Sequence, residues 1–182
     1  MMSEAEKVGE APGAGWTLRL GLRFGVGMGV AYGLWLWGLH LTGNNAFGPK
    51  RMVFWFAVPL AVVASQWLLR RVFRPGAPGV GRALGVGGLT AVLAAGIGTA
   101  CLLGLARGAG EAAQELNRRE LLEIAESQRE LMVKQAGSEA AYQAHLERLK
   151  HLTADDLARN DFSKILLLGL LFGLPAGVFL RE

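Results

Sequence analysis

The sequence predicts an all-α polytopic membrane protein with four transmembrane helices and an amphipathic helical arm between the third and the fourth. The first observation is four apolar stretches without any acid, in which Lys164 is the one cation; they lie at residues 24–41, 52–69, 83–106 and 162–180. About 20 residues of helix cross the hydrocarbon core of a bilayer, so each stretch is close to the required length. The second is a charged segment between the last two stretches. The third is glycine at every fourth position in two of them.

These observations divide the chain of 182 residues into four parts. Residues 1–15 are rich in Gly, Ala and Glu, and we expect a disordered tail. This start lacks the basic segment and the cleavage site of a signal peptide, so the first span should stay in the mature protein. Residues 16–106 should form a three-helix transmembrane region, residues 107–161 a charged arm and residues 162–182 the fourth transmembrane helix.

The connections between the first three spans are short and rich in turn residues. The sequence Gly43-Asn44-Asn45-Ala46-Phe47-Gly48-Pro49 ends the first span and predicts an antiparallel hairpin with the second. The second span carries Pro59, which a membrane helix tolerates where neighbours satisfy the freed carbonyl. Tryptophan occurs near the span ends, as expected of anchors at the membrane interface: Trp16, Trp35, Trp37, Trp55 and Trp67.

Glycine at every fourth position makes a flat face on a helix, and two such helices can approach closely in lipid. We therefore predict helix-packing faces in the first and fourth spans, formed by Gly21, Gly25, Gly29, Gly33, Gly169, Gly173 and Gly177. The pattern does not decide between packing inside one chain and contact between copies. Cys101 lies in the third span and has no second cysteine to pair with, so it should be a small packing residue.

The arm contains helix-forming residues with an apolar stripe at helical spacing. We expect its contacts to be made by Leu121, Ile124, Leu131 and Met132. The sequence Ala136-Gly137-Ser138 should break this helix, and a second helix should carry Tyr142. Thr153 and Asp156 then have the spacing of a capping box, and the helix that they open can continue into the fourth span. The arm is thus predicted to be a pair of amphipathic helices without a core of its own. Its apolar stripe should be covered by the second arm helix, by another copy of the chain or by the membrane surface.

Few residues in the spans have side chains that could bind a ligand or transfer a proton. His40 and Gln66 could line a polar path, although an interfacial histidine and an amide that bonds across helices are the simpler interpretations. Glu147 and His151 are four apart, as on any solvated helix face. The sequence has no HExxH, GxSxG or CxxC motif and no pair of intramembrane carboxylates. We therefore expect no catalytic residues, no metal site and no cofactor.

Basic residues near the spans bear on the orientation. With both termini on one side, that side collects eight basic residues and the arm side nine, which is nearly a tie. The link at residues 70–82 is short and holds no acid, whereas long loops translocate despite their charge. We therefore expect both termini in the cytoplasm and the arm outside.

This layout resembles a known family. Three close spans come first, the link before the third runs Pro78-Gly79-Val80-Gly81-Arg82-Ala83-Leu84-Gly85-Val86-Gly87-Gly88, and a charged helical arm precedes a glycine-rich last span. In these features, over about residues 16–181, the chain is similar to the bacterial membrane proteins grouped as domain of unknown function 4199. The resemblance implies four spans and a location in the inner (cytoplasmic) membrane. It implies no activity and no functional residues.

Two functions remain open. The first is a non-catalytic membrane protein that packs or assembles through its glycine faces and its arm, with a homo-oligomer or another membrane protein as partner besides the lipid bilayer. The second is a small oligomeric transporter or channel with His40 and Gln66 on its path. The basic residues flank the spans and show no aromatic-basic runs, so we expect no nucleic acid partner.

Overall fold

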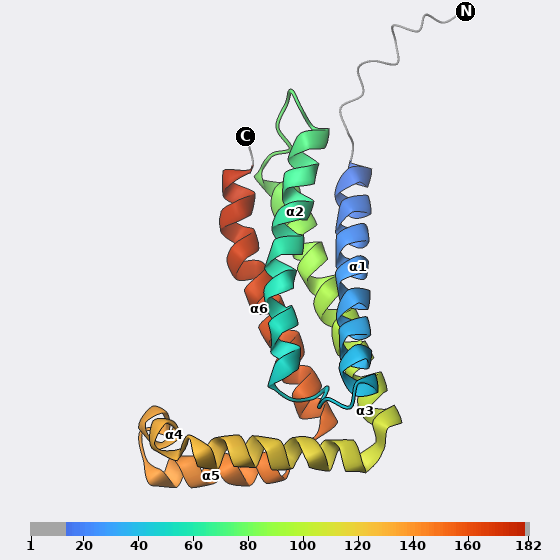
Figure 1. Ribbon diagram of the computed structural model, residues 1–182. Helices are drawn as coiled ribbons and strands as arrows, with labels where there is room; N and C mark the ends of the chain where they lie inside the picture. Colours follow the sequence, from blue (N-terminus) through green and yellow to red (C-terminus); the bar gives the residue numbers. More distant parts are fainter. Residues whose placement is uncertain (1–13, 181–182) are drawn as a thin grey trace, which may run out of the picture.

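A computed structural model describes residues 14–180, and it confirms an all-α fold with four apolar helices long enough to cross a membrane (Figure 1). No strand occurs within that part of the chain. The elements are α1 (Ala14–Leu41), the 3-10 helix η2 (Pro49–Phe56), α2 (Ala57–Val72), α3 (Val80–Ser127), α4 (Arg129–Ala136), α5 (Glu139–Lys150) and α6 (Ala154–Phe179). The tail expected at residues 1–15 lies almost entirely outside the described residues.

Four of these helices form a bundle with two different ends. The start of α1, the end of α6 and the turn between α2 and α3 lie at one end, and the arm crosses the other end (Figure 1). We call the first the arginine end, because Arg19, Arg23, Arg70, Arg71, Arg74 and Arg82 lie there. We call the second the arm end. The helix α3 lies at the centre and packs against α1, α2 and α6.

The second span begins in a tighter helix than expected. Residues Pro49–Phe56 form η2, and α2 starts only at Ala57, so Pro59 stands in the first turn of α2. A proline there is tolerated, because its ring does not clash with a preceding α-helical turn. Trp55 is buried in η2 with 7% of its surface exposed, so it is not the interface anchor that its position in the sequence suggested.

The third span and the arm share one long helix with a sharp bend. Gly110 has φ 75° and ψ −179°, and the helix axis turns there from the bundle into the arm. A positive φ with extended ψ is open to glycine and not to residues with a side chain. The boundary expected between residues 106 and 107 thus falls within α3, four residues before the bend.

The arm contains three helical segments where the sequence predicted two. The first predicted helix is interrupted at Gln128, with φ −109° and ψ 24°, so α3 ends at Ser127 and α4 follows. The hydroxyl of Ser127 donates to the carbonyl of Ile124 at 2.9 Å, a local bond that competes with helix continuation. The break at Gly137 is as expected: this residue caps α4 with φ 81°, in the left-handed region.

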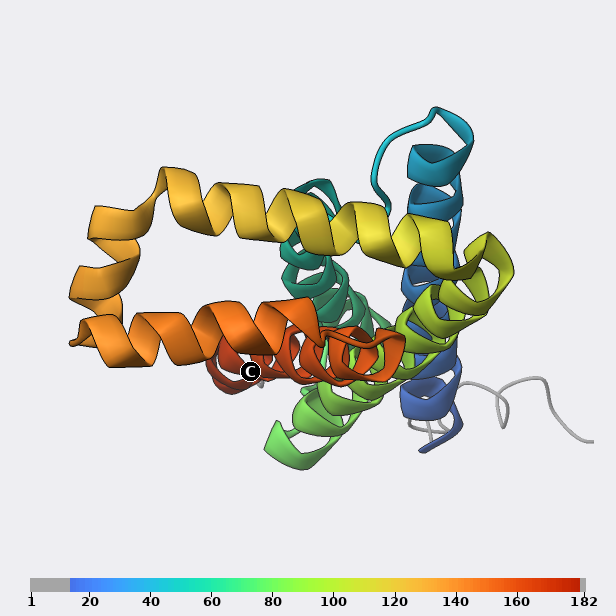
Figure 2. The ribbon, with the colours of Figure 1, turned by 90° about the horizontal axis from the view of Figure 1, so that it is seen from below.

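Two long segments of the arm lie side by side, and α4 connects them at the far tip (Figure 2). Tyr142 of α5 is buried between them, and its hydroxyl donates to the carbonyl of Ala125 at 3.3 Å. The capping box is also present: the Thr153 side chain accepts from the Asp156 amide, and the Asp156 carboxylate accepts from the Thr153 amide. The helix α6 therefore starts at Ala154, well before the apolar stretch at residue 162.

Candidate functional site

The glycines predicted in the first span all face α3. A side-chain carbon added at Gly21, Gly25, Gly29 or Gly33 would lie 2.6–2.7 Å from Leu89, Leu93, Ile97 or Cys101, respectively. Real side-chain carbons do not approach so closely, so each glycine lets one α3 side chain reach the α1 backbone. This face of α1 is therefore occupied within the chain, and Cys101 is one of the packing residues.

The glycines of the fourth span face α2 and α3. Gly169 lies against Ala91, Gly173 against Val62, and Gly177 against Leu84, each within 2.7–2.8 Å of an added side-chain carbon. The space at Gly173 and Gly177 also admits Gln66, whose Nε2 donates to the carbonyls of Gly173 at 2.8 Å and Ala83 at 3.1 Å. Gln66 is thus an amide that bonds across three helices, as the simpler interpretation had it.

The structure does not bring His40 and Gln66 together. Gln66 is bonded near the arginine end, whereas His40 lies at the arm end, beside a hollow that it shares with Ala113 and Leu116. The ring of His40 meets Trp37 edge-on, with 6.1 Å between centroids. The two residues therefore do not form one site within the described chain.

The most polar buried site is a cluster that the sequence analysis missed. Asp161 of α6 has no exposed surface, and it joins three elements. Its Oδ1 accepts from Nε of Arg51 in η2 at 3.2 Å, and its Oδ2 accepts from the hydroxyl of Tyr32 in α1 at 2.5 Å. The ring of Tyr32 stacks on Phe54, with 5.4 Å between centroids. A buried carboxylate thus has a cationic and a neutral donor, which compensates for its removal from water.

Two assignments hid this cluster. Asp161 is the last residue of the segment predicted to be a charged arm, and Arg51 directly precedes the second apolar stretch, so each resembles a charge that flanks a span. The capping box at Thr153 was the available signal: a helix that starts there carries Asp161 two turns inside α6. The carboxylates of the arm are therefore not all on a solvated face.

The connection between α1 and η2 is fastened to the arm as well. The side-chain nitrogen of Asn45 donates to Glu120 at 2.7 Å and to Asn117 at 3.1 Å, both on the arm part of α3. Its side-chain oxygen accepts from the Phe47 amide at 2.9 Å. Asn117 is buried, so its contact with Asn45 is shielded from solvent.

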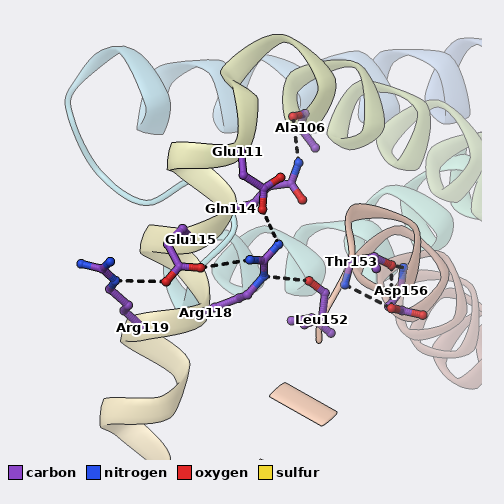
Figure 3. A network of polar contacts seen from close by, with 9 residues as sticks. All are labelled: Ala106, Glu111, Gln114, Glu115, Arg118, Arg119, Leu152, Thr153 and Asp156. Carbon is purple, nitrogen blue, oxygen red and sulfur yellow. Dashed lines mark hydrogen bonds and ion pairs between the residues drawn. The ribbon is translucent and has the colours of Figure 1, made fainter. Parts of the chain in front are cut away.

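A third contact spans both junctions between arm and bundle (Figure 3). Arg118 donates from Nη2 to Glu111 at 2.7 Å, next to the bend at Gly110, and from Nη1 to Glu115 at 3.0 Å. Its Nε donates to the carbonyl of Leu152 at 3.2 Å, just before α6 begins. One guanidinium therefore links the segment where the chain leaves the bundle to the segment where it returns.

The residues predicted to make arm contacts are not equally covered. Leu121, Ile124 and Met132 are half-buried, whereas Leu131 keeps 52% of its surface exposed. The second arm helix therefore covers part of the predicted stripe and leaves Leu131 open. Glu147, paired with Lys150 at 3.0 Å and near His151 at 3.3 Å, belongs to no group of three metal-ligating side chains within residues 14–180.

Taken together, the arm end holds three sets of polar contacts. Asp161 joins α6, η2 and α1 inside the bundle, Asn45 holds the α1–η2 connection to the arm, and Arg118 joins the two ends of the arm. The family described as "Protein of unknown function (DUF4199)" matches residues 23–182. Neither the comparison with curated proteins nor that with solved structures gives a match.

Proposed function

The chain belongs to the DUF4199 family, and we propose that it is a non-catalytic integral membrane protein that presents its arm as a fixed platform for assembly with a second copy or another membrane protein. One observation carries the proposal. Asn45 ties the arm to the connection between α1 and η2, and Arg118 joins the two ends of the arm to each other, yet the tip of the arm extends beyond the bundle (Figures 1 and 2). A membrane anchor alone needs no such support.

The charges and apolar groups of the arm fit this role. Its outer surface carries ion pairs such as Arg119 with Glu115 at 3.2 Å and Arg129 with Glu139 at 2.9 Å, which suit contact with water. Leu131 is an exposed apolar residue near the tip, where a partner could cover it. In the predicted orientation, the platform lies on the outer side of a bacterial inner membrane.

The glycine faces have a supporting role in this proposal. Those of α1 and α6 are filled by side chains of α2 and α3, so they favour packing within one bundle over contact between copies. Assembly is therefore assigned to the arm.

Crosslinking in native membranes tests the platform. A photocrosslinking residue at Met132 should give a discrete product, and Leu131→Asp should remove it while the melting temperature stays unchanged, because Leu131 is exposed. Glu126→Gln, an exposed change on the same arm, is the matched control and should keep the product. A product of equal yield in Leu131→Asp would contradict the proposal.

Buried Asp161 favours a second candidate, a small oligomeric transporter. Ionisable side chains inside membrane proteins often mark ion pathways. The double variant Arg51→Gln with Asp161→Asn removes both charges and so avoids an unpaired one. If it abolishes uptake into reconstituted vesicles, or the phenotype of the host, while abundance and crosslinking stay normal, transport replaces the platform as the better explanation.

A further inference from the structure

An apolar groove separates α1 from α2 on the outer surface of the bundle. It has a volume of about 390 Å³, and its walls include Arg23 and Ala31 of α1 with Ala61 and Leu68 of α2. Because α1 runs from the arginine end towards the arm end, Arg23 stands at the outer mouth of the groove. Ala31 and Ala61 lie deeper, towards the middle of the bundle.

The floor of this groove is a glycine that no helix uses. A side-chain carbon added at Gly27 would meet no atom within 4 Å, whereas one at Gly25 or Gly29 would collide with α3. Gly27 therefore has no packing role within the described chain. Its missing side chain leaves a hollow beside Phe24 and Met28, on the face of α1 that points away from α3.

Among the described residues, the charges around the mouth have one sign. The arginine end carries six arginines, and residues 14–110 contain no aspartate or glutamate. Arg23 is exposed and has no ion pair among the described residues. A long side chain in this position can keep its methylene groups on the apolar wall and its guanidinium at the level of lipid headgroups.

We infer that the groove binds one anionic phospholipid, with its phosphate on Arg23 and one acyl chain along Gly27. Both requirements meet in one place: an apolar channel directed into the bilayer, and a guanidinium at its interfacial mouth that can form two hydrogen bonds with a phosphate. Basic pockets between transmembrane helices are suited to anionic headgroups. This site lies at the opposite end of the bundle from the arm and does not depend on the platform.

A helix from a second copy fits the groove less well. A helix with side chains is about 10–12 Å across, and it would have to cover Arg23 with apolar surface at the mouth. An acyl chain is one methylene wide, and its own headgroup neutralises the arginine. The charge at the mouth therefore decides in favour of lipid.

Native mass spectrometry of the full chain with phosphatidylglycerol or phosphatidylcholine tests the site. The wild-type protein should retain one phosphatidylglycerol in preference to phosphatidylcholine. Arg23→Gln should weaken that retention about tenfold, since it removes a charge-assisted hydrogen bond to phosphate. Gly27→Leu should fill the hollow and have a similar effect. Ala31→Leu provides a second filling variant if Gly27→Leu does not fold.

Two matched controls separate this site from general attraction. Arg74→Gln removes the same charge at the same end outside the groove, and Gly38→Leu adds the same side chain at another open glycine of α1. Both should retain phosphatidylglycerol like the wild type. If Arg23→Gln and Arg74→Gln lose equal amounts of bound phosphatidylglycerol, the inference is wrong. It is also wrong if the filling variants retain phosphatidylglycerol like the wild type. If the spectrum of Gly27→Leu lacks a dimer that the wild type shows while lipid retention is unchanged, the groove binds a second copy of the chain instead.

Discussion

The two ends of the bundle differ in whether their charged side chains are paired within the chain. At the arm end, arginines and carboxylates of the same chain meet: Arg51 with Asp161 inside the bundle, and Arg118 with Glu111 and Glu115 at its edge. At the arginine end, the described chain offers cations without acids, and two of them lie over aromatic rings, Arg71 over Trp67 at 3.8 Å and Arg82 over Phe73 at 5.2 Å.

This contrast separates two uses of charge in one membrane protein. Charges paired inside the chain hold elements in fixed positions, which is why they surround the arm. Charges left for the surroundings determine orientation and attract anionic lipid. The arm end is thus fixed by its own contacts, whereas the arginine end interacts with the membrane.

The largest effect should come from breaking the buried pair. Asp161→Asn or Arg51→Gln should lower the free energy of unfolding by about 3–5 kcal/mol, because the remaining partner stays buried without its counter-charge. Reversible unfolding in mixed micelles measures this change. Removing both charges together should lower the free energy of unfolding by less than either single change does.

Charge removal at the other end provides the comparison. Arg74→Gln, at an exposed position, should change the free energy of unfolding by less than about 0.5 kcal/mol. Similar losses for Asp161→Asn and Arg74→Gln would mean that the two ends do not differ in the way described.

A smaller effect should separate neighbouring glycines of α1. Gly25→Ala places a carbon 2.7 Å from Leu93, close to the α3 backbone, and should destabilise the bundle by about 1–3 kcal/mol. Gly27→Ala enters the open groove and should be nearly neutral. Melting temperatures in detergent measure both. A larger loss for Gly27→Ala would show that the packed face of α1 is not the one that contacts α3.

The sequence predicted the helices well because their signals are local. Length without charge identifies the spans, and the residue pairs Thr153/Asp156 and Gly137/Ser138 identify helix ends. Glycine spacing also identified a packed face on α1, but it could not name α3 as the neighbour, since spacing contains no information on partners.

The buried cluster could not be read in the same way. Asp161 lies 110 residues after Arg51 and 129 residues after Tyr32 in the sequence. Only the tertiary fold therefore brings these three side chains together. Local context was misleading, because an acid at the end of a charged segment resembles its solvated neighbours. Gln128 shows the opposite case: the periodic stripe from Leu121 to Met132 passes through a break at Gln128 that the spacing of apolar residues does not reveal.

The last test determines which side of the membrane each end faces. The positive-inside rule predicts the arginine end in the cytoplasm, because residues 70–82, around the turn from α2 to α3, hold four arginines and no acid. In a Cys101→Ala background, Ala77→Cys should resist a membrane-impermeant maleimide in intact cells and react after lysis, and Glu126→Cys on the arm should react in both. Both positions are exposed, so accessibility within the protein does not limit either reaction. Arg71→Glu with Arg74→Glu should shift part of the population to the reverse pattern, since it removes the charge bias. Labelling of Ala77→Cys from outside with protection of Glu126→Cys would mean that the cations at the arm end determine the orientation despite being paired.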